Sequence, residues 1–180
     1  MKFCSSCGSH VVISIPVGDN RERFVCADIS CSTIHYQNPK IITGCLPLYE
    51  DKVLLCKRAI EPRYGLWTLP AGFMENGETT EQGALRESWE EAHANLHIEH
   101  LYTLFSLPYI NQVYFFYKAQ LTDTQFSSSP ESLEVKLFSE GEIPWDQLAF
   151  SVVEKTLRYY FADRKNNTYP LHLEDIEKKL

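Results

Sequence analysis

Residues 72–91 read GFMENGETTEQGALRESWEE and decide the fold of this 180-residue chain. The glycine-containing start predicts a loop, and residues 79–92 predict a helix with Thr79 and Thr80 as candidate caps. On a helix that turns about 100° per residue, Glu87, Glu90 and Glu91 share one face. The other face, expected to be the core side, carries Leu85, Ser88, Trp89 and Ala92.

The three glutamates on one helix face require a positive partner. Like charges three and four residues apart repel one another and cost helix stability. Hard divalent cations prefer oxygen ligands, and Mg²⁺ is usually held by a few carboxylates together with phosphate oxygens and water. Arg86 lies four residues before Glu90 and is placed to orient that carboxylate. Taken alone, the acidic run also fits a solvated helix face, so the loop before it decides between the two interpretations.

Loop and helix together match the signature of a known family in register. The chain resembles the Nudix hydrolases, whose signature is G-x5-E-x7-R-E-U-x-E-E-x-G-U, where U is a bulky aliphatic residue. The matching positions are Gly72, Glu78, Arg86, Glu87, Glu90 and Glu91. The resemblance implies an α+β fold, an α/β/α sandwich around a mixed sheet. It also implies that Glu87, Glu90 and Glu91, helped by the carbonyl of Ala71, bind catalytic Mg²⁺ or Mn²⁺.

Two positions depart from that signature. Ser88 replaces an aliphatic residue, and His93 replaces the glycine that would end the helix in the left-handed conformation. Either His93 adopts that conformation itself, or Asn95 takes over the helix stop. Neither change removes a candidate metal ligand.

The first 36 residues predict a small module held together by metal. A hairpin is expected from residues 11–15 and 23–26, with turn residues between them. Paired cysteines flank it at both ends: Cys4, Cys7, Cys26 and Cys31. This pattern is typical of a zinc ribbon, in which a structural Zn²⁺ supplies folding energy that so few apolar residues cannot.

The sequence leaves open which residues complete the zinc site and what the remaining cysteines do. The second cysteine pair is spaced by four residues instead of the commoner two, so His35 or His10 is an alternative for one zinc ligand. Cys45 and Cys56 lie in apolar, strand-like runs and are expected to be core residues.

After Asn38-Pro39 the chain changes to longer predicted strands. They cover 41–49, 53–56, 101–107, 113–121 and 133–138, and a helix over 151–162 closes the domain. That order predicts a mixed sheet with helices on its faces. The expected organisation is a zinc ribbon at 1–36, a Nudix hydrolase domain at 37–162 and a charged C-terminal tail at 163–180. The tail is expected to be a loosely held helix or a mobile segment.

The ribbon narrows the resemblance within the family. Together with IHYQNPK at 34–40, it is similar to the zinc-containing subgroup that includes NADH pyrophosphatases. Those enzymes carry a further motif, S-Q-P-W-P-F-P-x-S, whereas this chain has SLPYINQ at 106–112, which disfavours NADH. Residues 58–65 and 138–145 are more similar to ribbon-bearing members associated with ADP-ribose and FAD hydrolysis. The resemblance spans roughly residues 1–162.

The expected reaction is hydrolysis of the pyrophosphate bond of a nucleoside diphosphate linked to a second group, X. ADP-ribose or FAD is the expected substrate, and the products are AMP and phosphorylated X. Metal ions would neutralise the bridging phosphates and lower the pKa of a bound water. A further carboxylate would take the proton, and Glu131 and Glu134 are the candidates, each of which also fits a surface glutamate. Glu78 is expected to support the loop.

Substrate recognition requires rings to stack and charges to meet phosphate. Trp67, Phe105 and Tyr109 are candidates for stacking, and Arg58 and Arg63 for phosphate binding. Each aromatic residue also fits a place in the core.

The net charge and the distribution of apolar residues limit which partners and which cellular location we expect for this protein. A net charge of −7 argues against a protein that grips nucleic acid through its phosphates, whereas a small-molecule nucleotide substrate bridged by metal remains acceptable. No apolar run approaches the roughly 20 residues needed to cross a bilayer, and no signal peptide is visible. We therefore expect a cytoplasmic protein without membrane contact, and leave a homodimer open. The alternative functions are a housecleaning nucleoside triphosphate pyrophosphohydrolase and a non-enzymatic ADP-ribose-sensing domain.

Overall fold

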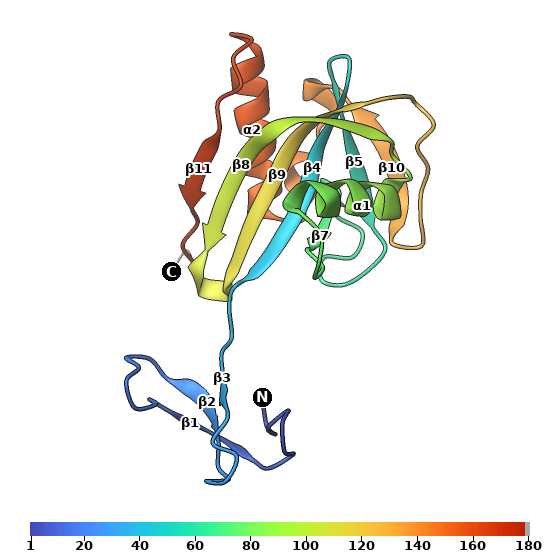
Figure 1. Cartoon of the computed structure of the whole chain (residues 1–180). Helices are drawn as coiled ribbons and strands as arrows, with labels where there is room; N and C mark the ends of the chain where they lie inside the picture. Colours follow the sequence, from blue (N-terminus) through green and yellow to red (C-terminus); the bar gives the residue numbers. More distant parts are fainter. Residues whose placement is uncertain (179–180) are drawn as a thin grey trace. The chain divides into compact units, whose positions relative to one another are not determined.

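A computed structural model describes residues 1–178 of the chain (Figure 1). The chain divides into two compact units, one from Met1 to Pro39 and one from Lys40 onward. The boundary lies three residues beyond the expected end of the ribbon at residue 36. Within the described residues, no helix has both the length and the apolar character of a membrane span.

The first unit is a small antiparallel sheet of β1 (Val11–Ser14), β2 (Arg23–Cys26) and β3 (Ile34–His35). Val11 pairs with Cys26 and Ser14 with Arg23, which confirms the predicted hairpin. The buried residues of this unit are two cysteines, Cys4 and Cys26. This unit therefore has almost no apolar core of its own.

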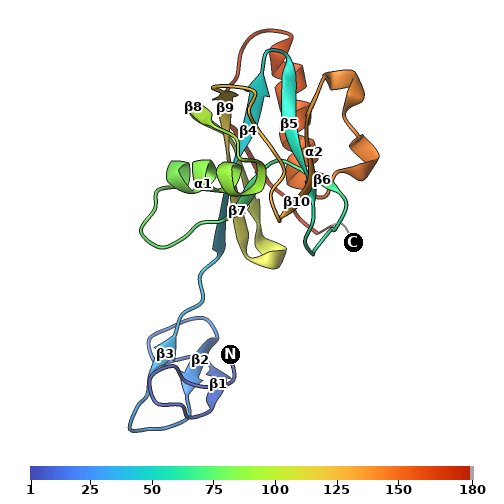
Figure 2. The ribbon, with the colours of Figure 1, turned by 90° about the vertical axis from the view of Figure 1, so that its right-hand side faces the viewer.

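The second unit is built on a mixed sheet, which has eight strands in its described part (Figures 1 and 2). Its main order is β10 (Ser132–Phe138), β5 (Lys52–Arg58), β4 (Lys40–Tyr49), β9 (Gln112–Leu121), β8 (Leu96–Leu107) and β11 (His172–Asp175). The short strands β6 (Trp67–Thr68) and β7 (Ala71–Phe73) pair with β5 and β4. β4 is parallel to β9 and β8 to β11, while the other pairs are antiparallel.

Two helices cover the two faces of this sheet (Figure 2). They are α1 (Thr80–Ala92) and α2 (Ser151–Arg164). Side chains of β5 alternate between them, because successive residues of a strand point to opposite faces. Val53 and Leu55 pack in the cluster that contains α2, and Leu54 packs in the cluster that contains Ala92 of α1. The expected α/β/α sandwich is confirmed. Short 3₁₀ helices lie at Pro108–Ile110, Glu140–Glu142 and Trp145–Gln147.

The packing of α1 differs from the expected pattern. Its buried residues are Gly83, Ala84, Glu87, Ser88, Glu91 and Ala92. Leu85 and Trp89, which were expected on the core side, are exposed, Trp89 by 50%. The small residues bring the helix close to the sheet, because a Cβ at Gly83 would collide with Thr43 of β4. The helix therefore turns part of its acidic face inward.

Both ends of α1 follow from local chemistry. The Thr79 side chain accepts a hydrogen bond from the Gln82 backbone, and the Gln82 side chain accepts one from the Thr79 backbone, forming a capping box. At the other end His93 has φ 49° and ψ 32°, so it adopts the left-handed conformation itself. Ser88 is accommodated in the core because its hydroxyl donates to the carbonyl of Ala84 at 2.7 Å.

The expected tail is partly an ordered strand. β11 pairs in parallel with β8, His172 opposite Thr103, so the expectation of a loose helix or a mobile segment is wrong there. Glu174 accepts hydrogen bonds from Lys155 at 2.6 Å and from Tyr159 at 2.8 Å, both on α2. Polar contacts of this kind have no hydrophobic period for a sequence pattern to detect. Residues 179–180 of the expected tail lie outside the described residues.

Candidate functional site

The second unit contains a cavity of about 780 Å³. Its walls come from the loop after β5, from β7 and α1, from neighbouring parts of β8 and β9, and from the start of α2. Acidic residues in the lining are Glu61, Glu75, Glu87, Glu90, Glu91 and Glu131, and basic ones are Arg58, Arg63 and Arg86. Phe73, Tyr109, Tyr114, Phe116 and Phe150 supply aromatic surface. The volume falls within the roughly 300–1,000 Å³ typical of small-molecule sites.

The helix-borne carboxylates reach this cavity because the β7 backbone allows close approach. A Cβ at position 72 would overlap the Glu87 carboxylate where it now lies, so Gly72 lets this carboxylate pack directly against the β7 backbone. Glu91 Oε2 accepts a hydrogen bond from the Ala71 backbone N–H at 3.3 Å. Glu87 and Glu91 are buried, whereas the side chain of Glu90 is half exposed. All three predicted metal-binding glutamates therefore line the same cavity.

Arg86 connects these acids to the preceding loop. Its Nε and Nη2 donate to the two oxygens of Glu78 at 3.0 and 2.8 Å, and Nη2 also reaches the Phe73 carbonyl at 3.1 Å. Its Nη1 donates to Glu87 at 2.7 Å and to Glu90 at 2.9 Å. The guanidinium thus orients Glu90 as expected and holds Glu87 as well. Hydrogen bonds from Arg86, and then from the Glu75 backbone, lower the pKa of Glu78 to about 2.

The innermost carboxylate, that of Glu91, forms no salt bridge within residues 1–178. Burial, and then the neighbouring charge of Glu87, raises the pKa of Glu91 to about 8. Burial also raises the pKa of Glu87, against the effect of Arg86. A cation seated among these oxygens would relieve both effects, since an opposite charge nearby favours the ionised form. The donor set therefore fits a hard divalent cation.

The glutamates are less tightly gathered than the cysteines of the first unit. Among residues 1–178, one set of His, Cys, Asp or Glu places its ligand atoms within 4.8 Å of one another, and it consists of Cys4, Cys7, Cys26 and Cys31. In the acidic site Arg86 Nη1 lies between Glu87 and Glu90 and takes part of the role of a cation. A metal would have to share these oxygens with the guanidinium.

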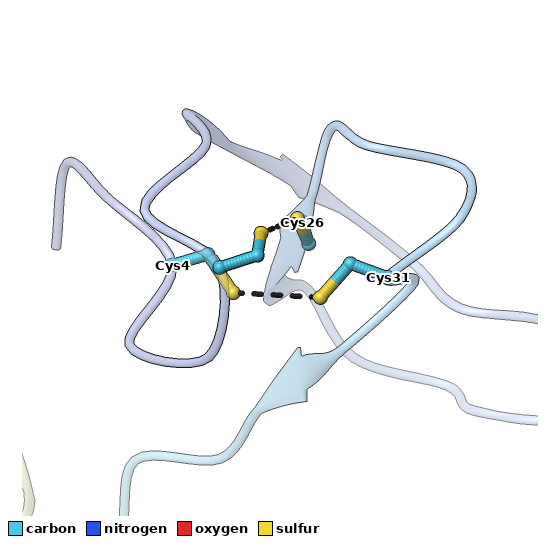
Figure 3. Close-up of side chains that lie close together, drawn as sticks. Cys4, Cys26 and Cys31 are labelled. Carbon is cyan, nitrogen blue, oxygen red and sulfur yellow. Dashed lines mark hydrogen bonds between the residues drawn. The ribbon is translucent and has the colours of Figure 1, made fainter.

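The cysteine cluster has the dimensions of a tetrahedral metal site (Figure 3). Cys4 Sγ lies 3.9 Å from Cys31 Sγ, and Cys7 Sγ lies 3.4 Å from Cys26 Sγ. Zn–S bonds of about 2.3 Å in tetrahedral geometry place sulfurs about 3.8 Å apart. The spacing therefore fits a single Zn²⁺ bound by four thiolates.

Neither histidine takes a place in this set. His35 Nε2 lies 3.3 Å from Cys4 Sγ, so it contacts one of the four clustered sulfurs without replacing it. The ring of His10 packs on Phe3, with centroids 4.8 Å apart. Burial raises the pKa of the Cys4 thiol, but hydrogen bonds from the Ser6 backbone and other neighbours outweigh it and hold the pKa at about 5. A low pKa favours the thiolate that metals bind.

Several other predicted residues also line the cavity, and some do not. Arg58, Arg63, Tyr109, Ala71 and Glu131 are among the lining residues. Trp67 and Phe105 are buried in the core instead, and Trp67 meets Phe138 edge to face with centroids 4.8 Å apart. Glu134 is exposed on β10 and lies outside the lining. Glu78 is not a lining residue, but it accepts hydrogen bonds from two residues that are, Arg86 and the Glu75 backbone.

Sequence reasoning missed several cavity residues, three of them on β9. Gln112, Tyr114 and Phe116 alternate along β9 and line the cavity together. The period of two was present in the sequence and marks one face of a strand. Phe150, at the start of α2, was also missed; its ring lies 5.2 Å from the guanidinium carbon of Arg58. That contact joins segments about 90 positions apart, which no local pattern predicts.

The second unit is an α/β/α sandwich whose cavity is lined by an acidic loop-helix motif, and a four-cysteine ribbon precedes it. Comparisons with known proteins identify the family that combines these features. The NUDIX domain model matches residues 39–160, and the model of the Nudix N-terminal zinc ribbon matches residues 2–37. The chain belongs to the Nudix family and carries the N-terminal ribbon found in some of its members.

Known relatives agree with this assignment. A crystal structure of a NUDIX hydrolase from Nitrosomonas europaea is 54% identical, has a TM-score of 0.95, and covers 99% of this chain and 100% of that one. The NAD-capped RNA hydrolase NudC of Photobacterium profundum is 37% identical over 49% of this chain and 31% of its own length. The ADP-ribose pyrophosphatase of Methanocaldococcus jannaschii is 34% identical over 41% of this chain and 43% of its own. The chain thus spans less than half of these two curated relatives.

Proposed function

We propose that this protein hydrolyses the pyrophosphate bond of a nucleoside diphosphate-X compound, with ADP-ribose or FAD as substrate and AMP plus phosphorylated X as products. The observation that carries the proposal is one cavity of about 780 Å³ that Glu87, Glu90 and Glu91 line together with the basic Arg58. Relatives named as a NUDIX hydrolase and an ADP-ribose pyrophosphatase support the reaction class.

The chain's own residues have distinct parts in this proposal. Glu87, Glu90 and Glu91, with the Ala71 carbonyl, would hold Mg²⁺ or Mn²⁺, which supplies charge neutralisation and a more acidic bound water. Arg86 keeps Glu87 and Glu90 oriented. Glu131 receives the proton from the attacking water, because it lines the cavity and Glu134 does not.

We propose a separate, structural role for Zn²⁺ in the first unit. Its ligands are Cys4, Cys7, Cys26 and Cys31, whose sulfurs are already gathered. All six cysteines of the chain lie among the described residues and are free of disulfides, which fits a reducing compartment such as the cytoplasm. The net charge of −7 argues against a nucleic-acid partner, and a small nucleotide remains the proposed substrate.

A substrate panel tests the proposal. FAD, ADP-ribose, NADH, nucleotide-sugars, nucleoside triphosphates and an NAD-capped RNA are incubated with the full chain and Mg²⁺, and the products are separated by chromatography. We expect AMP and a phosphorylated partner from FAD or ADP-ribose, and no turnover with excess chelator. Replacement of Glu131 by Gln should lower turnover about 100-fold, within the range for loss of a general base. The matched control Glu134→Gln should stay near wild type.

The same panel separates the alternatives. Release of inorganic pyrophosphate from a nucleoside triphosphate would identify the housecleaning enzyme. Tight ADP-ribose binding without metal-dependent turnover would identify a sensing domain.

A further inference from the structure

Two polar side chains of β9 form a pair within the cavity. Gln112 and Tyr114 are both half-buried lining residues. The Tyr114 hydroxyl donates to Gln112 Oε1 at 3.0 Å. Gln112 Nε2 has no hydrogen-bond partner within residues 1–178. It is also not among the fully buried polar atoms of that part of the chain that lack a partner, so solvent or a ligand can reach it. Its two N–H groups are therefore available to a ligand in the cavity.

Strand register places this pair away from the metal-binding carboxylates. Ile42 of β4 pairs with Phe73 of β7 on one side and with Tyr114 of β9 on the other. Phe73 directly follows Gly72, against which the Glu87 carboxylate packs. Two strand spacings separate β7 from β9, which is roughly 10 Å. A substrate whose phosphates lie at the glutamates would thus bring a neighbouring group to Gln112.

The hydrogen bond within the pair fixes which atoms face a ligand. Burial, and then the nearby Tyr109 phenol, raises the pKa of Tyr114, so its hydroxyl stays protonated and donates. The Gln112 oxygen already accepts one hydrogen bond, whereas both N–H groups of its amide are without a partner within residues 1–178. An amide that reads adenine needs both its oxygen and its nitrogen, one to accept and one to donate. A ring carbonyl oxygen needs the donors alone.

Aromatic surface lies beside this donor. Tyr109, in the 3₁₀ helix just before Gln112, is 45% exposed and lines the cavity. The rings of Tyr114 and Phe116, on the same strand, are stacked with their centroids 6.2 Å apart. An exposed tyrosine is suited to cover a flat ring, since aromatic pairs prefer offset stacking.

We propose that Gln112, oriented by Tyr114, binds a ring carbonyl oxygen of the X group, so that the site prefers a planar, carbonyl-bearing heterocycle of the flavin type over the sugar of ADP-ribose. This inference rests on the proposed pyrophosphatase function. Gln112 contacts the substrate, and Tyr114 is a positioning residue that acts through it.

The test compares two substrates that share the AMP half and differ in X. Steady-state kinetics are measured with FAD and with ADP-ribose for wild type, Gln112→Leu and Tyr114→Phe, with Mg²⁺ present. Gln112→Leu keeps the side-chain volume, and the matched control Gln120→Leu removes an amide further along β9. We expect Gln112→Leu to lower kcat/KM for FAD about 10-fold or more, mainly through KM, and to change ADP-ribose less than about 3-fold. Tyr114→Phe should act in the same direction and less strongly.

Two kinetic outcomes would overturn the inference while leaving the proposed function intact. Equal losses on FAD and ADP-ribose would mean that Gln112 reads the shared AMP half or only shapes the cavity. Unchanged kinetics would mean that it makes no substrate contact. If wild type hydrolyses neither compound, the proposed function fails first, and FAD binding measured by flavin fluorescence then decides. Weaker binding to Gln112→Leu than to Gln120→Leu supports the donor site, and equal binding overturns it.

Discussion

The two units of the chain differ in what is buried in their interiors. In the first unit the buried side chains are Cys4 and Cys26, while aliphatic residues such as Val17 and Ile29 are fully or almost fully exposed. In the second unit large apolar side chains such as Leu157 and Phe116 are completely buried between sheet and helix. From this difference we expect the ribbon to depend on a bound ligand for its fold, whereas the second unit has an apolar core of its own.

Zinc removal should produce the largest effect. Chelation, or Cys26→Ser, should unfold residues 1–39, because metal binding of about 10 kcal/mol or more supplies the folding energy of such a module. Hydrogen exchange followed by mass spectrometry should show full loss of protection there and little change from residue 40 onward. Cys45→Ser is a suitable control, since Cys45 is buried in the core of the second unit and is not one of the four clustered cysteines. Retained protection in the metal-free ribbon would show that the comparison is wrong.

A pair of apolar truncations sharpens the contrast within the holoprotein. Leu157→Ala removes a fully buried side chain of α2 and should lower the free energy of unfolding by about 2–5 kcal/mol. Val17→Ala removes an exposed side chain of the ribbon and should change it by about 0.5 kcal/mol or less. Urea unfolding measures both. If both substitutions lowered the free energy of unfolding by similar amounts, Val17 would have to be packed in an apolar core of the ribbon, and the contrast would be wrong.

The smallest effect concerns the loop that positions the acidic helix. The pKa of Glu78 falls from 4.5 to about 2 on folding, so this carboxylate stabilises the folded state above pH 4.5 and loses that effect as the pH falls toward 2. The difference in Tm between wild type and Glu78→Gln should therefore be constant from pH 5 to 7 and shrink between about pH 4.5 and 2. A difference that does not depend on pH would mean that the Arg86 contact contributes nothing through charge.

The spacing of residues along the sequence predicted those parts of the molecule whose contacts are made between residues close in sequence. The cysteine spacing predicted the ribbon, and the pattern from Gly72 to Glu91 predicted the loop and helix that line the cavity. The helix cap at Thr79 and the stop at His93 are local as well, and both were among the expected options. In these segments the relevant contacts span only a few residues.

Other features depend on contacts that no local pattern contains. The helix face was assigned by hydrophobicity, and this assignment failed at Leu85 and Trp89 because the helix packs on the sheet through small residues such as Gly83. Trp67 had the chemistry of a stacking residue, but packing against Phe138 placed it in the core. β11 is held by polar partners on α2, so its sequence resembles that of a mobile tail. Tertiary context decided each of these cases.

The central claim is that Glu87, Glu90 and Glu91 seat a divalent cation for catalysis, and Glu91→Gln tests it most directly. Mn²⁺ binding is followed by electron paramagnetic resonance, and turnover of FAD and ADP-ribose is measured on the same samples. We predict at least a 10-fold loss of Mn²⁺ affinity and a loss of turnover of about 1,000-fold, equivalent to about 4 kcal/mol of transition-state stabilisation, with Tm unchanged or raised. Normal Mn²⁺ affinity and normal turnover in Glu91→Gln would contradict the claim.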